Sequence, residues 1–219
     1  MVGQPEIRTE RLLLRPFALA DAPIVQKLAS DRAVASTTIN IPHPYEDGMA
    51  EEWIGSHPER FAKGEGVTFA VVRWPEDALI GAISLGISLQ HQHAEMGYWV
   101  GQPYWNDGYC TEAARAVLRY GFTELGLNRI YAQHMGRNPA SGRVMEKIGM
   151  QYEGCLRQHF KKWGAFEDVR RYGILRSEYL AEQGGDCFAK SARNDIVSGS
   201  HSSTKPRSND IRKQIEPIL

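Results

Sequence analysis

The stretch Gly97–Arg119, GYWVGQPYWNDGYCTEAARAVLR, decides the fold because three kinds of structure follow one another in it without a break. Its start continues the β-branched and aromatic run of His93–Val100, which predicts a strand. Gly101–Gly108 is rich in Gly, Pro, Asn and Asp and predicts a loop. Thr111–Leu125 repeats apolar residues with the period of a helix. The sequence therefore predicts a strand that leads through a short loop into a helix N-terminus.

Such a junction has the properties of an anion site. The first N–H groups of a helix have no partner within it, and the helix dipole is positive there. Gly108 permits close approach of the backbone to a ligand. The predicted helix then presents Arg115 and Arg119 on one face, and Arg143 and Lys147 repeat this spacing in the next predicted helix. Two interpretations fit this pattern. The junction binds a ligand with several phosphates, or its glycine serves only the geometry of the turn. Neither a Walker A loop nor GxGxxG is present.

The segments before this stretch predict one strand, two helices and a group of antiparallel strands. An apolar run over 7–15 predicts the strand, and Asp21 before Ala22-Pro23 predicts a helix to about residue 30. A second helix is expected over 45–62, with a break or kink at Pro58. Short turns join the next three strands, which are therefore antiparallel neighbours. These strands are expected at 67–74, 79–89 and 93–100.

The segments after it predict a strand at 129–135, then a helix opened by Asn138-Pro139 and closed by Gly149. Two further strands are expected at 151–162 and 165–176, around a Trp163-Gly164 turn. The order β-α-α-β-β-β-loop-α-β-α-β-β indicates an α/β fold of the mixed α+β kind, with helices covering a mostly antiparallel sheet.

Composition excludes several classes of protein. The chain has 219 residues, and its 26 Lys and Arg balance 26 Asp and Glu, so it has no bulk attraction for nucleic acid or an anionic membrane. Three scattered cysteines without a CxxC pair argue against a disulfide framework or a zinc site. Residues 1–10 show no apolar signal region, and no stretch approaches about 18 apolar residues. A soluble cytoplasmic protein is expected.

Domain organisation is expected to be one domain over 1–183 followed by a tail over 184–219. The tail is rich in Ser, Asn, Lys and Arg and contains no Trp or Tyr. Such a composition buries too little apolar area to offset its ordering entropy, so the tail is predicted to be disordered.

Six segments of the sequence carry a family resemblance: TERLLLRPF, LIGAISL, AEMGYWVG, PYWNDGYCTEA, LGLNRIYA and RNPASGRVMEKIGMQYEG. They cover about residues 7–180 and resemble, in the same order, the GNAT superfamily of N-acetyltransferases. More narrowly, they resemble its RimJ/RimL branch, whose best-known members acetylate the N-termini of ribosomal proteins. The resemblance implies the GNAT fold, in which a central pair of parallel strands splays apart to hold coenzyme A.

The resemblance also implies acetyl-CoA as cosubstrate. The family's pyrophosphate pattern [QR]xxGx[GA] falls on Trp105–Cys110, where Trp105 and Cys110 depart from it. Backbone amides of Asn106–Thr111 would hold the pyrophosphate, and Tyr98–Gly101 would pair with the pantetheine arm. Asn138 would hold the pantetheine amides. The residues assigned to the cosubstrate are Tyr98, Trp99, Val100, Trp105, Asn106, Asp107, Gly108, Tyr109, Cys110, Thr111, Asn138, Ser141 and Arg143.

Acetyl transfer to an amine needs a neutral nucleophile, and a lysine-like amine with a pKa of about 10.4 is protonated at pH 7. A general base therefore helps, and Glu95 is the candidate because its strand would abut the thioester. Ser141 is the candidate acid for the departing thiolate, with Tyr131 and Tyr152 as alternatives. Each of these residues also fits a purely structural role. Cys110 as a nucleophile is disfavoured because its place belongs to the phosphates, and no metal is expected.

Several functions remain open at this point. The leading one is an acetyl-CoA-dependent N-acetyltransferase, monomeric or homodimeric, whose acceptor is a protein N-terminal α-amine or a small-molecule amine. Acceptor specificity is expected to reside in 39–62 and 160–166. The alternatives are a non-catalytic acyl-CoA-binding module on the same fold and a phosphate or nucleic-acid binder. Zero net charge weighs against the last of these.

Overall fold

A single sheet with helices on both faces makes up the part of the chain that the computed structural model describes, residues 3–183. The strands are β1 (Ile7–Arg8), β2 (Leu12–Arg15), β3 (Gly66–Arg73), β4 (Ala78–Ser88), β5 (His93–Val100), β6 (Arg129–Met135), β7 (Gln151–Lys162) and β8 (Ala165–Leu175). The α-helices are α1 (Ala22–Ala29), α2 (Arg32–Thr37), α3 (Met49–Gly55), α4 (His57–Ala62), α5 (Tyr109–Thr123) and α6 (Pro139–Lys147). Residues 176–183 are also helical. The predicted tail at 184–219 lies outside the described residues.

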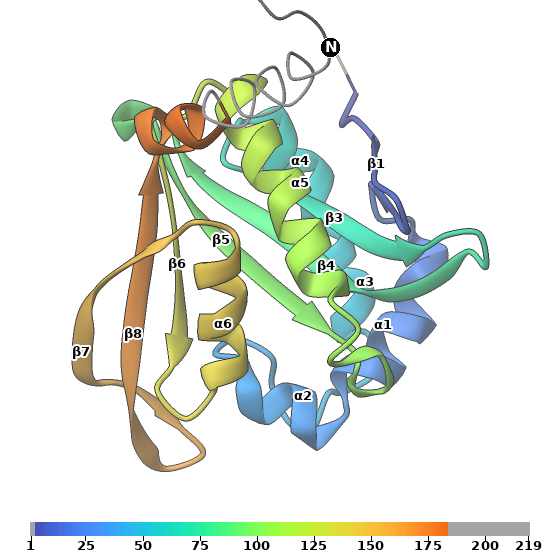
Figure 1. Ribbon diagram of the computed structural model, residues 1–219. Coiled ribbons are helices and arrows are strands. Elements are labelled where there is room, and N and C mark those ends of the chain that lie inside the picture. The colour runs from blue at the N-terminus through green and yellow to red at the C-terminus, as the bar shows by residue number, and fades with distance from the viewer. Residues whose placement is uncertain (1–2, 184–219) are drawn as a thin grey trace, which may run out of the picture. The chain divides into compact units, whose positions relative to one another are not determined.

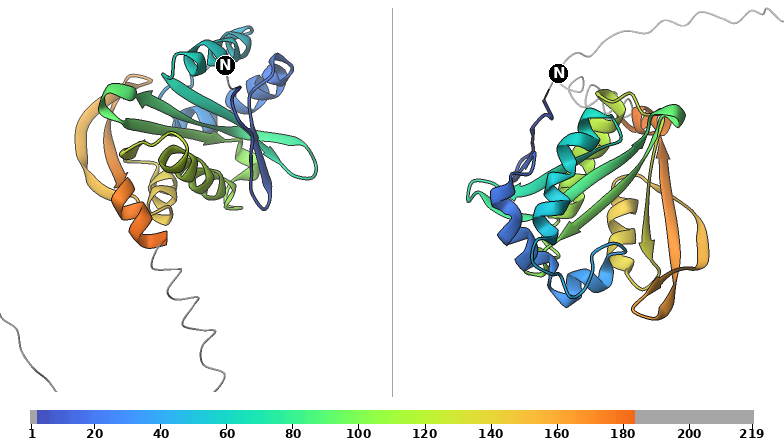
Figure 2. Two further views of the ribbon diagram at one scale, coloured as in Figure 1. Left: turned by 90° about the horizontal axis from the view of Figure 1, so that it is seen from above. Right: turned by 180° about the vertical axis from the view of Figure 1, so that it is seen from behind.

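The strand order is β1-β2-β3-β4-β5-β6-β8-β7, and β5 with β6 is its parallel pair. Figure 1 shows α5 and α6 in front of the sheet, and Figure 2 shows α1 to α4 on the opposite face. This arrangement confirms the predicted mixed α/β architecture.

The central strands separate along their length, and this separation positions the site. Parallel pairing of β5 with β6 runs from His93↔Arg129 to Met96↔Ala132. From Gly97 to Val100, the pairing of β5 within the described residues is to β4 alone. Figure 1 shows the two strands running apart beyond this point. Backbone N–H and C=O groups on the inner edges of the gap are therefore available to a ligand.

Helix α5 is fixed closely against the sheet. A Cβ at Gly121 would lie 2.6 Å from Cδ1 of Ile130 on β6, so a larger residue at this crossing would force the Ile130 side chain to shift. Phe122 and Leu118 are fully buried on the same helix face. Burial of each such side chain contributes about 1.5–3 kcal/mol. The N-terminus of α5 is consequently held at a fixed place beside the end of β5.

Most predicted elements are confirmed, and the differences have local causes. The run at 7–15 forms two short strands joined by a turn, in which the Thr9 amide donates to the carbonyl of Leu12. The helix expected over 45–62 is two helices that meet at Ser56, with Pro58 in the first turn of α4. Helix α2 was not predicted. Helix α5 starts at Tyr109, two residues earlier than expected.

Candidate active site

One cavity of about 650 Å³ passes from the N-terminus of α5, through the gap between β5 and β6, to the helices on the opposite face. On the first side it is lined by the loop 104–111 and by α6. On the other side it is lined by α1, α2, α3, the segment 37–45 and the inner strands. The cavity joins Gly108 and Ser141 to Glu95 in one continuous space.

The loop before α5 is open and preorganised. Gly108 is the N-cap of α5 with a φ of +82°, and Asn106 also has a positive φ of +69°. No side chain caps this helix end within the described residues. The indole of Trp105 donates to the carbonyl of Val100 at 2.7 Å, which ties the loop back to β5. The N–H groups of the first turn of α5 are therefore uncapped where the loop lines the cavity.

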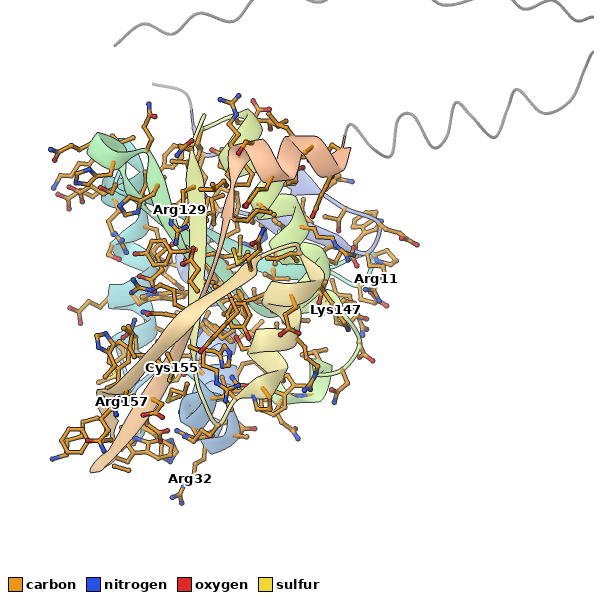
Figure 3. The ribbon with its side chains drawn as sticks, turned by 60° about the vertical axis from the view of Figure 1, so that its left-hand side comes forward. Arg11, Arg32, Arg129, Lys147, Cys155 and Arg157 are labelled. Carbon is orange, nitrogen blue, oxygen red and sulfur yellow. The ribbon has the colours of Figure 1, made fainter. Side chains whose placement is uncertain are left out.

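Glu112 anchors this end of α5 to the β1–β2 turn. Its carboxylate accepts from the Thr9 hydroxyl at 2.6 Å and from the Arg11 amide and guanidinium at 2.9 and 2.7 Å. Arg11, labelled in Figure 3, also donates to the carbonyl of Asp107 at 3.0 Å. Partial burial alone would raise the pKa of Glu112, but the bonds from Thr9 and Arg11 leave this pKa below its ordinary value. Sequence reasoning missed the anchor because its partners lie about a hundred residues apart.

Helix α6 lines the cavity on the same side of the sheet as the N-terminus of α5. Its N-cap, Asn138, accepts from the Ser141 amide at 3.4 Å and donates from Nδ2 to the carbonyl of Thr37 at 3.2 Å. The predicted cap is thus confirmed, and the amide also links α6 to α2. Arg143 and Lys147 are exposed on α6, the latter visible at its end in Figure 3. Both line the cavity on the side of α5.

Tyr98, Ser141 and Cys110 meet where the strands part. The Tyr98 hydroxyl donates to the carbonyl of Ser141 at 3.1 Å, and the two hydroxyl oxygens lie 3.0 Å apart. Burial raises the pKa of Tyr98 well above its ordinary value. Burial also raises the pKa of the Cys110 thiol to about 12, so it is protonated at neutral pH. Cys110 is therefore not a thiolate nucleophile.

Glu95 lies in the cavity on the side of α1 to α4, and it is held by its neighbours. Gln133 on β6 donates from Nε2 to Glu95 Oε1 at 2.8 Å, and the Tyr131 hydroxyl is 3.5 Å from Oε2. Arg171 in turn donates to Gln133 Oε1 at 3.5 Å, which orients the amide. Sequence reasoning missed Gln133, because its place diagonally opposite Glu95 follows from the register Glu95↔Tyr131. Tyr152, an alternative acid, is exposed and is not among the cavity residues.

The segment that follows α2 and lines the cavity is fixed by cations from distant parts of the chain. Lys162, at the end of β7, donates from Nζ to the carbonyls of Ile39 and Ile41 at 3.2 and 2.7 Å. Arg137 donates to the carbonyl of Ser36 at 2.6 Å. Residues 160–166 and 39–62 were expected to contribute to acceptor specificity, and these bonds join the two segments.

Comparison with known proteins decides the family. A family model described as an acetyltransferase (GNAT) domain matches residues 11–151. The chain belongs to the GNAT acetyltransferase family. It is 33% identical to the uncharacterized N-acetyltransferase p20 of Bacillus licheniformis over 173 residues, which are 78% of this chain and 96% of p20.

Two solved GNAT structures extend the comparison. The spermidine N-acetyltransferase of Vibrio cholerae in complex with CoA and spermine is 28% identical, with a TM-score of 0.69, over 78% of this chain and 99% of the other. RimL, a ribosomal L7/L12 alpha-N-protein acetyltransferase in complex with coenzyme A, is 17% identical, with a TM-score of 0.72, over 78% and 98%. The likeness to RimL is one of fold alone.

This GNAT protein is thus an acetyl-CoA-dependent N-acetyltransferase, as its sequence predicted. Within residues 3–183, no group of three or more His, Cys, Asp or Glu side chains is placed to hold a metal ion. No helix in the same range has the length and apolar character needed to cross a membrane.

Proposed function

We propose that this protein transfers the acetyl group of acetyl-CoA directly to a primary amine, protein N-terminal or small-molecule, with Glu95 as general base. One observation carries the proposal. A single cavity reaches from the uncapped N-terminus of α5 to the carboxylate of Glu95. Donor and acceptor can therefore meet inside one cavity, in the gap between β5 and β6.

The chain's own groups supply the binding. The amides of Asn106 to Thr111 hold the pyrophosphate, because this turn leaves its N–H groups uncapped and exposed. The free edge of β5 from Gly97 to Val100 offers main-chain groups to the pantetheine arm, with Tyr98, Trp99 and Asn138 around it. Arg143 on α6 adds a positive charge on the same side of the cavity.

Acetyl-CoA supplies the acyl group as a thioester. Glu95 takes the proton that the incoming ammonium must lose, and Gln133 holds the carboxylate by donating to Oε1 at 2.8 Å. A C–N bond forms as the C–S bond breaks, and the sulfur leaves with the electron pair. We assign the Ser141 hydroxyl, which Tyr98 holds in place, to give its proton to this sulfur and to take the second proton from the nitrogen as the amide forms.

The substitution Glu95→Gln tests the role of the base. An amide cannot accept the proton, so we expect kcat to fall about 10²-fold, as is typical for loss of a general base. Free-thiol release from acetyl-CoA with an amine panel gives the rate, and a calorimetric titration of CoA should show unchanged affinity.

Glu76→Gln is the matched control, because Glu76 is an exposed carboxylate outside the cavity. It should retain wild-type turnover. Equal turnover of E95Q and wild type across pH 6–9 would remove Glu95 from the mechanism. Binding of CoA without thiol release on any amine would instead favour a non-catalytic acyl-CoA-binding module.

A further inference from the structure

The acceptor half of the cavity is walled mainly by apolar side chains. Val25, Val34 and Ala29 come from α1 and α2 and are buried. Met49 and Trp53 from α3 are half-buried beside them. Such walls favour a ligand with an apolar surface and exclude water from around it.

Charge is sparse in this half. Glu95 is the one carboxylate among the described residues that line the cavity. The cations of the lining, Arg143 and Lys147, belong to α6 on the opposite side of the sheet. One ammonium of an acceptor can therefore be matched by Glu95. A second ammonium on the same small molecule would be buried without a second carboxylate among these lining residues, which is strongly unfavourable.

From these walls and this single carboxylate, we propose that the acceptor is a small primary amine on an uncharged, apolar carrier, with the reacting amine as its one charge. The inference rests on the proposed function and narrows its acceptor. It separates this protein from enzymes that acetylate polyamines, whose substrates carry further ammonium groups.

A matched pair of amines tests the inference on the full-length wild-type protein. Hexylamine and cadaverine have nearly the same length and shape, but a methyl group in the first replaces an ammonium in the second. Thiol release is measured at saturating acetyl-CoA with varied amine. The kcat/KM for each amine is calculated from the concentration of its unprotonated form, so that differences in amine pKa cancel. We expect hexylamine to exceed cadaverine at least tenfold.

Each outcome has a definite meaning. A hexylamine-to-cadaverine ratio below ten overturns the inference, as does a higher kcat/KM for spermidine or for an alanine tripeptide amide than for hexylamine. In those cases the proposed acetyl transfer stands. Absence of thiol release with every amine overturns the proposed function, and the inference falls with it.

A substitution that adds the missing charge provides a second test. Met49→Glu places a carboxylate at the first position of α3, where the helix dipole tolerates it. We expect it to lower the hexylamine-to-cadaverine ratio about tenfold. Met49→Gln has the same shape without the charge and should leave the ratio close to that of wild type. Equal ratios in M49E and M49Q would contradict the charge argument.

Discussion

His57 is buried in an aromatic cluster. Its ring lies 4.5 Å from the ring of Trp53 and 5.5 Å from that of Phe17, centroid to centroid. Within the described residues, neither ring nitrogen has a hydrogen-bond partner. Burial lowers the pKa of His57 to about 4, with a smaller contribution from Arg60. The native state therefore keeps this imidazole neutral at a pH where the unfolded chain protonates it.

This residue should make stability depend on pH. Below an ordinary His pKa of about 6.5, the unfolded state binds a proton that the native state does not, so the free energy of unfolding falls as pH falls, until about pH 4. The expected loss between pH 7.5 and 4.5 is about 2–3 kcal/mol. Urea unfolding of wild type and His57→Phe at both pH values measures it. A loss in H57F as large as in wild type would contradict the assignment.

At the scale of elements, α5 depends on the backbone of Gly108. A φ of +82° at its N-cap is natural for glycine and unfavourable for residues with a Cβ. This backbone conformation directs the N–H groups of the first turn of α5 toward the loop that lines the cavity. The sheet beneath α5 fixes the rest of the helix, so a change at residue 108 should act on the loop.

Gly108→Ala tests this dependence. We expect a loss of about 1–2 kcal/mol of stability from the left-handed conformation, together with weaker binding of CoA. Gly108→Asn is the matched variant, because Asn tolerates this conformation better, and it should lose less of both. Thermal unfolding and calorimetric CoA titration give the two readings. Equal losses in G108A and G108N would show that steric crowding, and not φ, sets the requirement for glycine.

At the scale of the whole described unit, distant segments complete the side of the cavity that we propose for the acceptor. Lys162 from β7 and Arg137 from the β6–α6 loop donate to carbonyls of Ser36, Ile39 and Ile41. Ser36 lies in the last turn of α2, and Ile39 and Ile41 belong to the segment after it, which has little regular structure. The shape of this segment is therefore set by donors from β7 and the β6–α6 loop.

Lys162→Met should release this segment while leaving the cosubstrate half intact. We expect KM for the amine to rise severalfold, with unchanged affinity for CoA, because two hydrogen bonds from a charged donor are lost. Lys161→Met is the control, since Lys161 lies over the ring of Phe166 and makes no bond to this segment. Steady-state kinetics with varied amine decides the matter. Equal KM values in K162M and K161M would show that Lys162 does not shape the acceptor side.

The sequence predicted elements where periodicity and turn residues agreed, as in β5, β6 and β7. Helix α2 was missed because its six residues, RAVAST, are too short for a periodic signal, and the bonds from Arg137 and Asn138 that hold its end come from far along the chain. Glu95 was the candidate base because its predicted strand would abut the thioester. Its partner Gln133 depends on the register of β5 against β6, which a single sequence does not reveal.

The bonds of Lys162 also bear on the order in which the protein acquires its shape. They join residues 121 and 123 positions apart in the chain, so they close one of its longest loops. Contacts of such separation carry a large closure entropy and tend to form late in folding. The bonds of Glu112 to Thr9 and Arg11, which hold the start of α5, span 103 and 101 positions and close a loop of similar length. We therefore expect both halves of the cavity to be completed late in refolding, after the β3–β4 and β4–β5 pairs, whose partners are close in the chain.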